Sequence, residues 1–600
     1  MNQRRLSQST ATAVEPVTPA ATQPALLRSH SMVVPKGTSP DTATSGAEAL
    51  VETLVELGVE HAFGIFGGGI APFCEALSRS SIRLLHFRHE GGAAFAAIES
   101  SLASGKLTVV LATTGPGLTN LYTGMVAARS EGAKVLFVSG STAAAQRGRM
   151  AFQETRAYSN SMSPLFSQGA LFHYAAMVED AAELEVVAAR LRSGFAQPGG
   201  FVAHLGLPLT TQTAKLPEVK PSRLSAGPPP SCDPAQVQEC AELLSREPFV
   251  IWAGFGARHA APAIRELASR TGAHVMCTPR GKGIMPETDP LYLGVTGLGG
   301  HSHVEHYLQR ARPVRALVLG SRLGEMSSFW SSRLLPQQGI IHVDLDPEVF
   351  GAAFPSVATR SVQSEIGAFV EALLQAWPEQ ANPARPGATE LPLPRTVAPR
   401  RLGPVRPSFL MSRVQRQIVE GSDALVLTEA GNAFALGSHY LRFMEPNRYR
   451  VSSGFGSMGQ AAAGVLGAAL GSRRKAVAIL GDGAMLMQNE INTAATYGID
   501  AVWIVLNDAR YGMIAQGMES IGWVPFETDF SRANFVEIAR AMGGDGVSVA
   551  LESELDAALE QALAAKGPFV IDVAIDREEL APAIGRNQSL LQQGVNGRAS

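Results

Sequence analysis

The chain has 600 residues, too many for one hydrophobic core, and this length predicts three or four domains. With 46% hydrophobic and 17% charged residues, its composition is that of an ordinary globular protein. The net charge of −3 leaves no surplus of cations to neutralise phosphates, so we expect no nucleic-acid partner.

The chain also lacks the usual signs of a membrane protein or a secreted protein. No apolar run reaches the roughly eighteen residues of a transmembrane helix, so we expect no membrane partner. The four cysteines have spacings that fit neither a zinc site nor a disulfide framework, which favours reduced thiols and a cytoplasmic location. Residues 1–44 are rich in Ser, Thr, Ala and Pro and lack the apolar core of a secretory signal. We predict a disordered tail there, with an organelle transit peptide as the alternative.

The first ordered block is predicted at residues 45–225. Ser45 and Glu48 form a capping-box pattern, leucines follow at helical spacing, and Gly58 supplies a stop. The strand-like runs AFGIF, TVVLAT and KVLFVSG then alternate with helical segments. Alternation of this kind predicts a parallel sheet covered by helices.

Two more α/β blocks follow along the chain. A proline-rich stretch at 228–234 opens the block 226–376, which contains the strand-like runs FVIWAG, RALVLG and GIIHVDLDP. A linker rich in Pro and Arg, 377–407, leads to the block 408–580, and residues 581–600 are expected to form a second tail. The predicted fold is therefore α/β, with three doubly wound parallel-sheet domains.

The most informative motifs lie in the last block, where two strand-like runs end in polar residues. One run ends at Gly481-Asp482-Gly483, and the next ends at Asn507. Because parallel strands end at the same edge of a sheet, Asp482 and Asn507 could share a hard cation such as Mg²⁺. The glycines beside Asp482 would let the backbone approach a diphosphate closely. Taken singly, each motif is more often a simple turn.

Taken together, these motifs resemble the binding signature of thiamine-diphosphate (ThDP) enzymes, in which GDG is followed about two dozen residues later by Asn. The resemblance is to the acetolactate-synthase-like group and runs from about residue 45 to residue 576. It implies a pyrimidine-binding domain, a central domain and a diphosphate-binding domain. Matching segments are FRHEGGAAFAA, TTGPGLTN, AFQE, TPRGKGIMPETDPLYLG, IIHVDLDP and SSGFGSMGQAAAGVLGAALG.

The resemblance implies roles for particular residues. Glu90 would protonate N1′ of the ThDP pyrimidine, which the cofactor needs in order to activate its C2 atom; the alternative is a surface helix carboxylate. Met458 would support the bent cofactor, and otherwise would be an ordinary core residue. Gln153 corresponds to an active-site glutamine. The other implied cofactor contacts are Gly115, Gly431, Asn432, Gly481, Asp482, Gly483, Ala484, Asn507, Gly512 and Met513, and the implied metal ligands are Asp482, Asn507 and the carbonyl of Ala509.

The resemblance implies a ThDP- and Mg²⁺-dependent carboligase. Such an enzyme decarboxylates a 2-oxo acid such as pyruvate and adds the acyl carbanion to a second carbonyl, giving an acyloin or an acetohydroxy acid. The alternatives are a decarboxylase, lyase, oxidase or acyltransferase acting on a 2-oxo acid or acyl-CoA, and an inactive scaffold or regulatory homologue. In the family, two chains share each active site, which implies a homodimer or homotetramer. FAD in the central domain is left open.

Two departures from the family pattern lie near the expected substrate. Gly91 stands where acetolactate synthases usually have Gln after the catalytic Glu, and the segment Gly64-Ile-Phe-Gly-Gly lacks the usual proline. We therefore expect an acceptor pocket that differs from that of the housekeeping enzyme.

Overall fold

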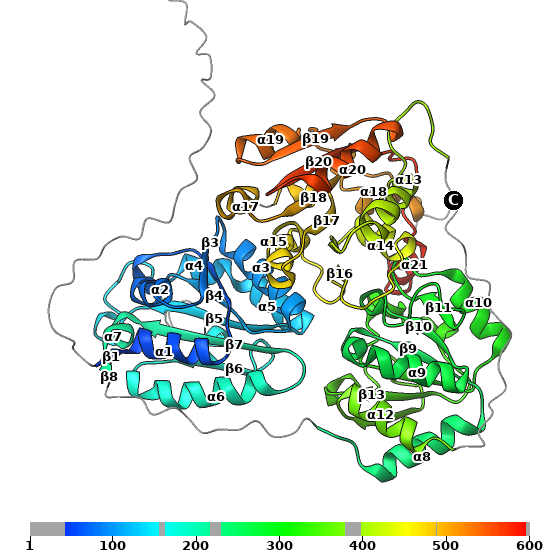
Figure 1. The fold of residues 1–600 in the computed structure, drawn as a ribbon, viewed down its shortest axis with the longest axis horizontal. Helices are drawn as coiled ribbons and strands as arrows, with labels where there is room; N and C mark the ends of the chain where they lie inside the picture. Colours follow the sequence, from blue (N-terminus) through cyan, green and yellow to red (C-terminus); the bar gives the residue numbers. More distant parts are fainter. Residues whose placement is uncertain (1–42, 155–162, 217–229, 379–397, 488, 596–600) are drawn as a thin grey trace, which may run out of the picture. The chain divides into compact units, whose positions relative to one another are not determined.

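The computed structural model describes residues 43–154, 163–216, 230–378, 398–487 and 489–595. Within these ranges the chain forms three six-stranded sheets, and every strand pair in them is parallel. Helices cover both faces of each sheet (Figure 1). The predicted α/β fold with three doubly wound domains is confirmed. The predicted N-terminal tail lies almost wholly outside the described residues.

The first sheet has the strand order β3-β2-β4-β5-β7-β6. Its inner strands β4, β5 and β7 are almost wholly buried, which explains their largely apolar sequences. The helix after Ser45 begins with the predicted capping box, because the Ser45 and Glu48 side chains each bond to the other's backbone N–H. The strands are β2 (His61–Gly64), β3 (Arg83–His86), β4 (Thr108–Ala112), β5 (Lys134–Ser141), β6 (Tyr174–Met177) and β7 (Phe201–Pro208). The helices are α1 (Gly46–Glu56), α2 (Ala71–Ser78), α3 (Glu90–Ser104), α4 (Pro116–Asn120), α5 (Tyr122–Glu131), α6 (Leu184–Ala196) and α7 (Leu209–Thr213), and β1 (Thr44–Ser45) pairs antiparallel with β8 (Lys215–Leu216).

The second sheet has the order β11-β10-β9-β12-β13-β14, so the strand order reverses between β9 and β12. Such a reversal is where doubly wound sheets open a crevice for ligands. The strands are β9 (Phe249–Ala253), β10 (His274–Cys277), β11 (Tyr292–Val295), β12 (Arg315–Leu319), β13 (Ile340–Asp344) and β14 (Thr359–Gln363). The helices are α8 (Pro234–Arg246), α9 (Ala261–Thr271), α10 (Ser302–Ala311), α11 (Glu325–Ser328) and α12 (Ile366–Ala376).

The third sheet has the order β16-β15-β17-β18-β20-β19. Its central strands β17 and β18 carry the GDG and Asn-Asp motifs at their carboxyl ends. The strands are β15 (Leu425–Thr428), β16 (Tyr449–Val451), β17 (Ala476–Gly481), β18 (Ala501–Asn507), β19 (Asp545–Val549) and β20 (Phe569–Ala574). The helices are α13 (Pro407–Val414), α14 (Asn432–Tyr440), α15 (Gln460–Ser472), α16 (Asp482–Met485), α17 (Ile491–Tyr497), α18 (Gly512–Ser520), α19 (Phe535–Ala541), α20 (Leu555–Ala564) and α21 (Ile584–Gln592).

The first and third domains share one hydrophobic core, in which helices α3 and α15 pack against each other. Both helices are rich in Ala and Gly at the contact, so their backbones approach closely. A Cβ atom on Gly467 of α15 would lie only 1.7 Å from the carbonyl oxygen of Ala96 in α3. Beside this contact, Arg450 and Glu99 form a buried ion pair with an N–O distance of 3.4 Å. This packing fixes α3, and with it Glu90 at the helix start, against the third domain.

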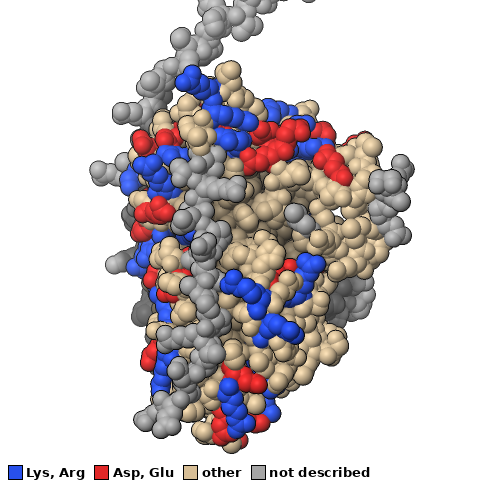
Figure 2. Space-filling model, turned by 90° about the vertical axis from the view of Figure 1, so that its right-hand side faces the viewer, with Lys and Arg blue, Asp and Glu red and all other residues tan. Residues whose placement is uncertain are grey.

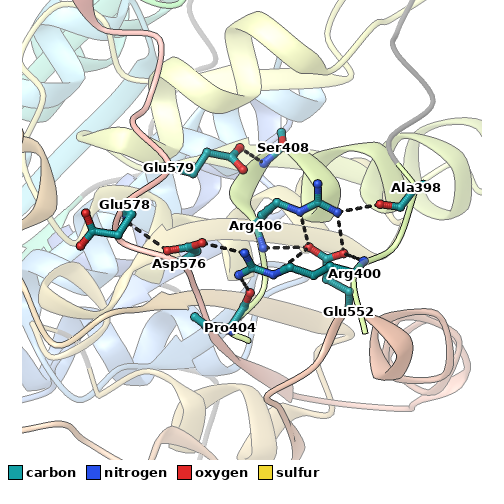
Figure 3. Close-up of polar contacts among 9 residues, drawn as sticks. All are labelled: Ala398, Arg400, Pro404, Arg406, Ser408, Glu552, Asp576, Glu578 and Glu579. Carbon is teal, nitrogen blue, oxygen red and sulfur yellow. Dashed lines mark hydrogen bonds and ion pairs between the residues drawn. The ribbon is translucent and has the colours of Figure 1, made fainter. Parts of the chain in front are cut away.

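The end of the predicted linker is anchored to the third domain by the buried carboxylate of Glu552 (Figure 3). Its oxygens accept hydrogen bonds from the backbone N–H groups of Arg400 and Arg406, at 2.7 and 3.2 Å. The Arg406 guanidinium adds two further bonds to the same carboxylate, at 2.7 and 2.8 Å. Arg400 also pairs with Asp576 at 2.9 Å. The chain therefore enters α13 in a fixed direction.

The predicted C-terminal tail contains the nine-residue helix α21. In it, the Ser589 hydroxyl donates a hydrogen bond of 2.7 Å to Glu325 of the central domain. A Cβ atom on Gly585 would lie 2.6 Å from the Phe329 ring, so the helix packs closely on that domain. The helix depends on these distant contacts, which the local sequence does not reveal.

The surface drawn in Figure 2 carries charges of both signs, and the cysteines are unpaired. On the face drawn in Figure 2, Lys and Arg side chains are interspersed with Asp and Glu, and neither sign covers it. Among the described residues, no helix is both long enough and apolar enough to cross a membrane. All four cysteines are free thiols, and three of them are buried.

Candidate active site

The ends of strands β17 and β18 bring Asp482 and Asn507 to the same edge of the third sheet. Gly481 pairs with Leu506 in the register of the two strands, so the next residue on each strand is Asp482 and Asn507 respectively. Both side chains are buried. The Asp482 carboxylate accepts the backbone N–H groups of Gly483 and Ala509, at 2.7 and 2.6 Å. The strand ends therefore lie side by side, as the sequence predicts.

The amide group of Asn507 has hydrogen bonds on its nitrogen and none on its oxygen within the described residues. Its amide nitrogen donates hydrogen bonds to Asp572 at 2.8 Å and to the Ala533 carbonyl at 3.1 Å. The amide oxygen is buried and has no hydrogen-bond partner among the described residues. A buried polar oxygen without a partner costs free energy unless something else binds it. Amide and carboxylate oxygens are ligands that Mg²⁺ accepts, so Asp482 and Asn507 fit a magnesium ion.

A second carboxylate, that of Asp508, lies beside the Asp482 side chain. Burial, and then the charge of Asp508, raise the pKa of Asp482 to about 6. Burial also raises the pKa of Asp508. Two partly desolvated carboxylates repel each other, and a divalent cation would offset that repulsion. The charges of Arg577, Arg510 and Arg532 act to lower the pKa of Asp508, and a cation would offset the repulsion that remains between the two carboxylates.

Ala509 has an unusual backbone conformation at this edge. Its φ of +56° lies in the left-handed region, which a residue with a side chain adopts only when its surroundings require it. Two hydrogen bonds require it here, because its N–H donates to Asp482 and its carbonyl accepts from Phe530 at 3.0 Å. A carbonyl oxygen has two lone pairs, so one remains for the metal contact that the resemblance implies.

Three short loops converge around these strand ends. Gly431, with a φ of +112°, precedes helix α14, and the buried amide oxygen of Asn432 has no hydrogen-bond partner among the described residues. A Cβ atom on Gly512 at the start of α18 would lie 3.0 Å from the Asn432 amide nitrogen. A Cβ atom on Gly483 would lie 2.6 Å from the Tyr511 ring. The starts of α14, α16 and α18 thus offer close backbone approach and N–H groups, which suit a diphosphate.

The remaining third-domain residues implied to contact the cofactor lie on α16, on α18 and on the loop before α15. Met458 is 39% exposed on that loop, and a Cβ atom on the next residue, Gly459, would lie 3.6 Å from Met487. Ala484 is buried in α16, and Met513 in α18 packs on the hydrophobic core of the third domain. The exposure of Met458 argues against its being an ordinary core residue.

Glu429, which the sequence did not single out, supports the Met458 loop. Its buried carboxylate accepts the backbone N–H groups of Ala461 and Ala462 at the start of α15, at 3.0 and 3.3 Å. Burial raises the pKa of Glu429 to about 7, although four backbone hydrogen bonds act to lower it. The only local signal was a carboxylate two positions before Gly431, at the end of an apolar strand.

Glu90 lies in the first domain as the first residue of α3, and its side chain is buried. One carboxylate oxygen accepts a hydrogen bond of 3.0 Å from the Asn120 amide, a partner that the sequence did not single out. A Cβ atom on Gly117 would lie 3.2 Å from the other oxygen. The alternative that Glu90 is a surface carboxylate is therefore wrong.

Gln153 lies against the turn that contains Gly115. The Thr114 hydroxyl donates a hydrogen bond of 3.4 Å to the Gln153 amide oxygen. A Cβ atom on Gly115 would lie 3.0 Å from the Cβ atom of Gln153. Both residues have positive φ angles, of +57° and +56°. The structure thus brings Gln153 to the GPG turn, although it lies 38 positions further along the chain.

The predicted site residues therefore form two groups. Glu90, Gly115 and Gln153 belong to the first domain, whereas Asp482, Asn507 and the other residues belong to the third. In the described part of the chain, no hydrogen bond joins a predicted site residue of one group to one of the other.

Comparison with known proteins assigns the three domains to one family. The N-terminal TPP (thiamine pyrophosphate) binding domain of thiamine pyrophosphate enzymes matches residues 44–161, their central domain matches 237–373, and their C-terminal TPP binding domain matches 429–573. Thiamine pyrophosphate is another name for ThDP, so both groups of predicted site residues fall largely within ThDP-binding domains.

The chain is also similar to curated proteins along most of its length. It is 29% identical to the large subunit of acetolactate synthase isozyme 1 of Escherichia coli, covering 89% of this chain and 94% of that protein. It is 26% identical to the isozyme 2 large subunit of the same organism, covering 92% and 100%. The acetolactate synthase large subunit of Parasynechococcus marenigrum is 27% identical, covering 89% and 88%. With all three domains of the family in order and this similarity along its length, the chain belongs to the thiamine pyrophosphate enzymes and is an acetolactate-synthase-like, ThDP-dependent enzyme.

Proposed function

We propose that the protein is a ThDP- and Mg²⁺-dependent carboligase that acts on 2-oxo acids. It would decarboxylate a 2-oxo acid such as pyruvate and add the acyl group to a second carbonyl, giving an acyloin or an acetohydroxy acid. The observation that carries the proposal is the buried pair of Asp482 and Asn507 at the ends of neighbouring strands. The amide oxygen of Asn507, which has no hydrogen-bond partner among the described residues, fits a cation. The three helix starts beside it suit a diphosphate. Acetolactate synthases are the relatives that favour carboligation.

The proposal gives the two groups of residues different tasks. ThDP, when bound, supplies a C2 atom that can carry negative charge next to a carbonyl. Asp482, Asn507 and the Ala509 carbonyl would hold the metal, and Gly431, Asn432, Gly481, Gly483, Ala484, Gly512 and Met513 would surround the diphosphate. Glu90 would hold a proton at the pyrimidine N1′, Met458 would support the ring system, and Gly115 and Gln153 would face the reacting end.

The assembly is proposed to be a homodimer or a homotetramer. The two groups of site residues would then meet across an interface, Glu90 from one chain and Asp482 from the other. Large apolar side chains around the third-domain site support this, because an exposed apolar patch commonly marks an interface. These are Leu486, Met487, Ile514, Trp523, Val524 and Phe526, of which Val524 is 82% exposed. Sedimentation tests this proposal: an active species of monomer mass would contradict it.

Other predictions from the sequence remain proposals. FAD in the central domain is the first of these, and the sequence leaves it open. The absorption spectrum of the purified protein tests for a flavin. The boundaries 1–44, 45–225, 226–376, 377–407, 408–580 and 581–600, and the cytoplasmic location, are part of the same proposal.

Incubation with pairs of 2-oxo acids tests the reaction. With ThDP and Mg²⁺ present, we expect release of CO₂ and a product whose mass is that of the two acids less one CO₂. A free aldehyde as the main product would favour a decarboxylase instead. Omission of ThDP is the control, and consumption of 2-oxo acid that does not depend on ThDP would refute the proposal. A folded protein that binds ThDP but converts none of the acids would favour the inactive scaffold.

A further inference from the structure

The strand and loop that lead to Glu90 are bound along their length to a segment of the third domain. The backbone N–H of His86 donates a hydrogen bond of 2.8 Å to the Tyr497 hydroxyl. The Arg88 side chain donates to Asn492 at 2.6 Å and to Thr496 at 3.1 Å. The docked segments are therefore residues 86–89 before α3 and residues 490–497, which include α17.

The centre of this contact is the carboxylate of Glu490, which is 1% exposed. It accepts the backbone N–H of Arg88, at 3.3 and 3.2 Å from its two oxygens, and the N–H of His89, at 3.1 Å. The Thr493 hydroxyl donates to it at 2.5 Å. Glu490 thus binds the two peptide N–H groups that immediately precede Glu90.

The contact is built for a carboxylate. N–H groups at the start of a helix have no partner within the helix and need an acceptor from outside. A carboxylate can accept several such bonds, and charge-assisted hydrogen bonds are stronger than neutral ones. A Cβ atom on Gly92 would lie 2.6 Å from a Glu490 oxygen, so only glycine leaves room for it. Burial raises the pKa of Glu490, while the hydroxyl and backbone donors act to lower it.

We propose that Glu490 is a positioning residue: it fixes the backbone at Arg88 and His89 and thereby directs the Glu90 carboxyl toward the cofactor. The proposal rests on the proposed function of Glu90. Glu490 follows Asp482 by eight positions in the chain. A displacement of Glu90 by about 1 Å could cost on the order of 100-fold in rate.

The first experiment compares amide hydrogen exchange of the full-length protein without ThDP. Glu490→Gln keeps the side-chain shape but replaces one acceptor oxygen by an NH₂ group, which cannot accept. We expect amides in the peptide around residues 86–92 to exchange roughly tenfold faster or more, because hydrogen bonds to a charged acceptor are lost. Thr493→Val removes one donor to Glu490 and should give a smaller change in the same peptide. Unchanged exchange in both variants would overturn the proposal.

Glu552→Gln is a matched control for the loss of a buried carboxylate. Glu552 also accepts two backbone N–H groups, but it belongs to the network around Arg400 and Arg406 (Figure 3). Its substitution should leave exchange of the peptide around residues 86–92 as in the wild type. Faster exchange of that peptide in Glu552→Gln would mean that any core carboxylate loosens it, which contradicts a specific role for Glu490.

The second experiment measures deuterium exchange at C2 of bound ThDP. We expect Glu490→Gln to slow this exchange roughly 10- to 100-fold while ThDP affinity stays within about threefold of the wild type. In the Glu90→Gln background, Glu490→Gln should slow the C2 exchange little further, because Glu490 acts only by positioning Glu90. If the two effects multiply instead, Glu490 acts by another route and the proposal is wrong. If Glu490→Gln does not fold, Thr493→Val is carried through the same cycle and decides the question.

The outcomes separate this inference from the proposed function. A wild-type protein that neither binds ThDP nor exchanges C2 refutes the proposed function itself. A wild type that exchanges C2, together with a Glu490→Gln variant that exchanges it equally fast, refutes only the positioning role.

Discussion

The buried carboxyl of Glu429 gives a quantitative prediction about stability and pH. Burial raises its pKa in the folded protein to about 7, from an ordinary value of 4.5. The carboxylate accepts N–H groups from Ala430, Ala461 and Ala462. Glu429→Gln keeps the shape and one acceptor oxygen but removes the titration. The stability of the variant should therefore lack the part of its pH dependence that comes from the titration of Glu429.

The sign of the effect follows from proton binding. Between pH 4.5 and about 7, the folded protein keeps the Glu429 proton that the unfolded chain has already released. Stability falls with rising pH wherever the folded state binds more protons, so the wild type loses stability across this window. The difference between the two pKa values, at about 1.4 kcal/mol per pH unit, corresponds to on the order of 3 kcal/mol. Relative to wild type, Glu429→Gln should gain about that much by pH 8.

The assay is urea unfolding of the cofactor-free wild type and variant at about pH 5 and about pH 8. The measured quantity is the change with pH in the stability difference between variant and wild type. Glu552→Gln is the control, because its stability difference from the wild type should change with pH in the opposite direction. Burial raises the pKa of Glu552, but its hydrogen bonds to Arg406 and to backbone outweigh burial and lower it overall, so its charge stabilises the fold above the ordinary pKa. A difference for Glu429→Gln that does not change with pH would refute the reasoning.

Three further predictions test the site and the core. Asp482→Ala should weaken Mg²⁺-dependent ThDP binding by roughly 100-fold or more, because it removes a direct ligand and leaves the diphosphate charge uncompensated; wild-type affinity by calorimetry in a folded variant would contradict the metal assignment. Glu90→Gln should slow deuterium exchange at C2 of bound ThDP by about 10²–10⁴-fold while leaving ThDP affinity nearly unchanged; wild-type exchange by NMR after acid quench would show that Glu90 is not the activator. Gly467→Ala should destabilise the protein by about 1–3 kcal/mol, because its methyl group would overlap the Ala96 carbonyl in the contact between α3 and α15; an unchanged urea midpoint would contradict that packing.

The parts of the structure that the sequence predicted are those specified by residues close together in the chain. The capping box at Ser45 and Glu48 involves residues three positions apart and is present in α1. The GDG and Asn-Asp motifs lie at strand ends, because each follows a continuous apolar run that fits a buried parallel strand. Alternation of such runs with helices was sufficient to predict three α/β domains.

What the sequence could not predict depends on contacts between distant residues. Glu490 and the Arg88–His89 peptide are about 400 positions apart, so no local pattern connects them. Helix α21 has nine residues, and a helix of that length is marginal by itself, so its formation depends on packing against Phe329 and Glu325. The free oxygen of Asn507 is visible only once Asp572 and Ala533 are known to hold the amide nitrogen.

Three buried carboxylates, those of Glu429, Glu490 and Asp482, differ in the groups that surround them. This difference distinguishes carboxylates that hold a loop in place from one that could bind a ligand. Glu429 and Glu490 are satisfied by backbone N–H groups, so each holds a loop in place: one before α15 and one before α3. Asp482 also accepts two backbone N–H groups, yet it lies beside the carboxylate of Asp508, and the neighbouring strand ends at Asn507, whose amide oxygen has no hydrogen-bond partner among the described residues. Carboxylates that lie side by side in a buried place repel each other, and a bound cation would offset that repulsion. The same chemical group thus supports the loops in two places, and in the third, under the proposed function, it would bind the metal.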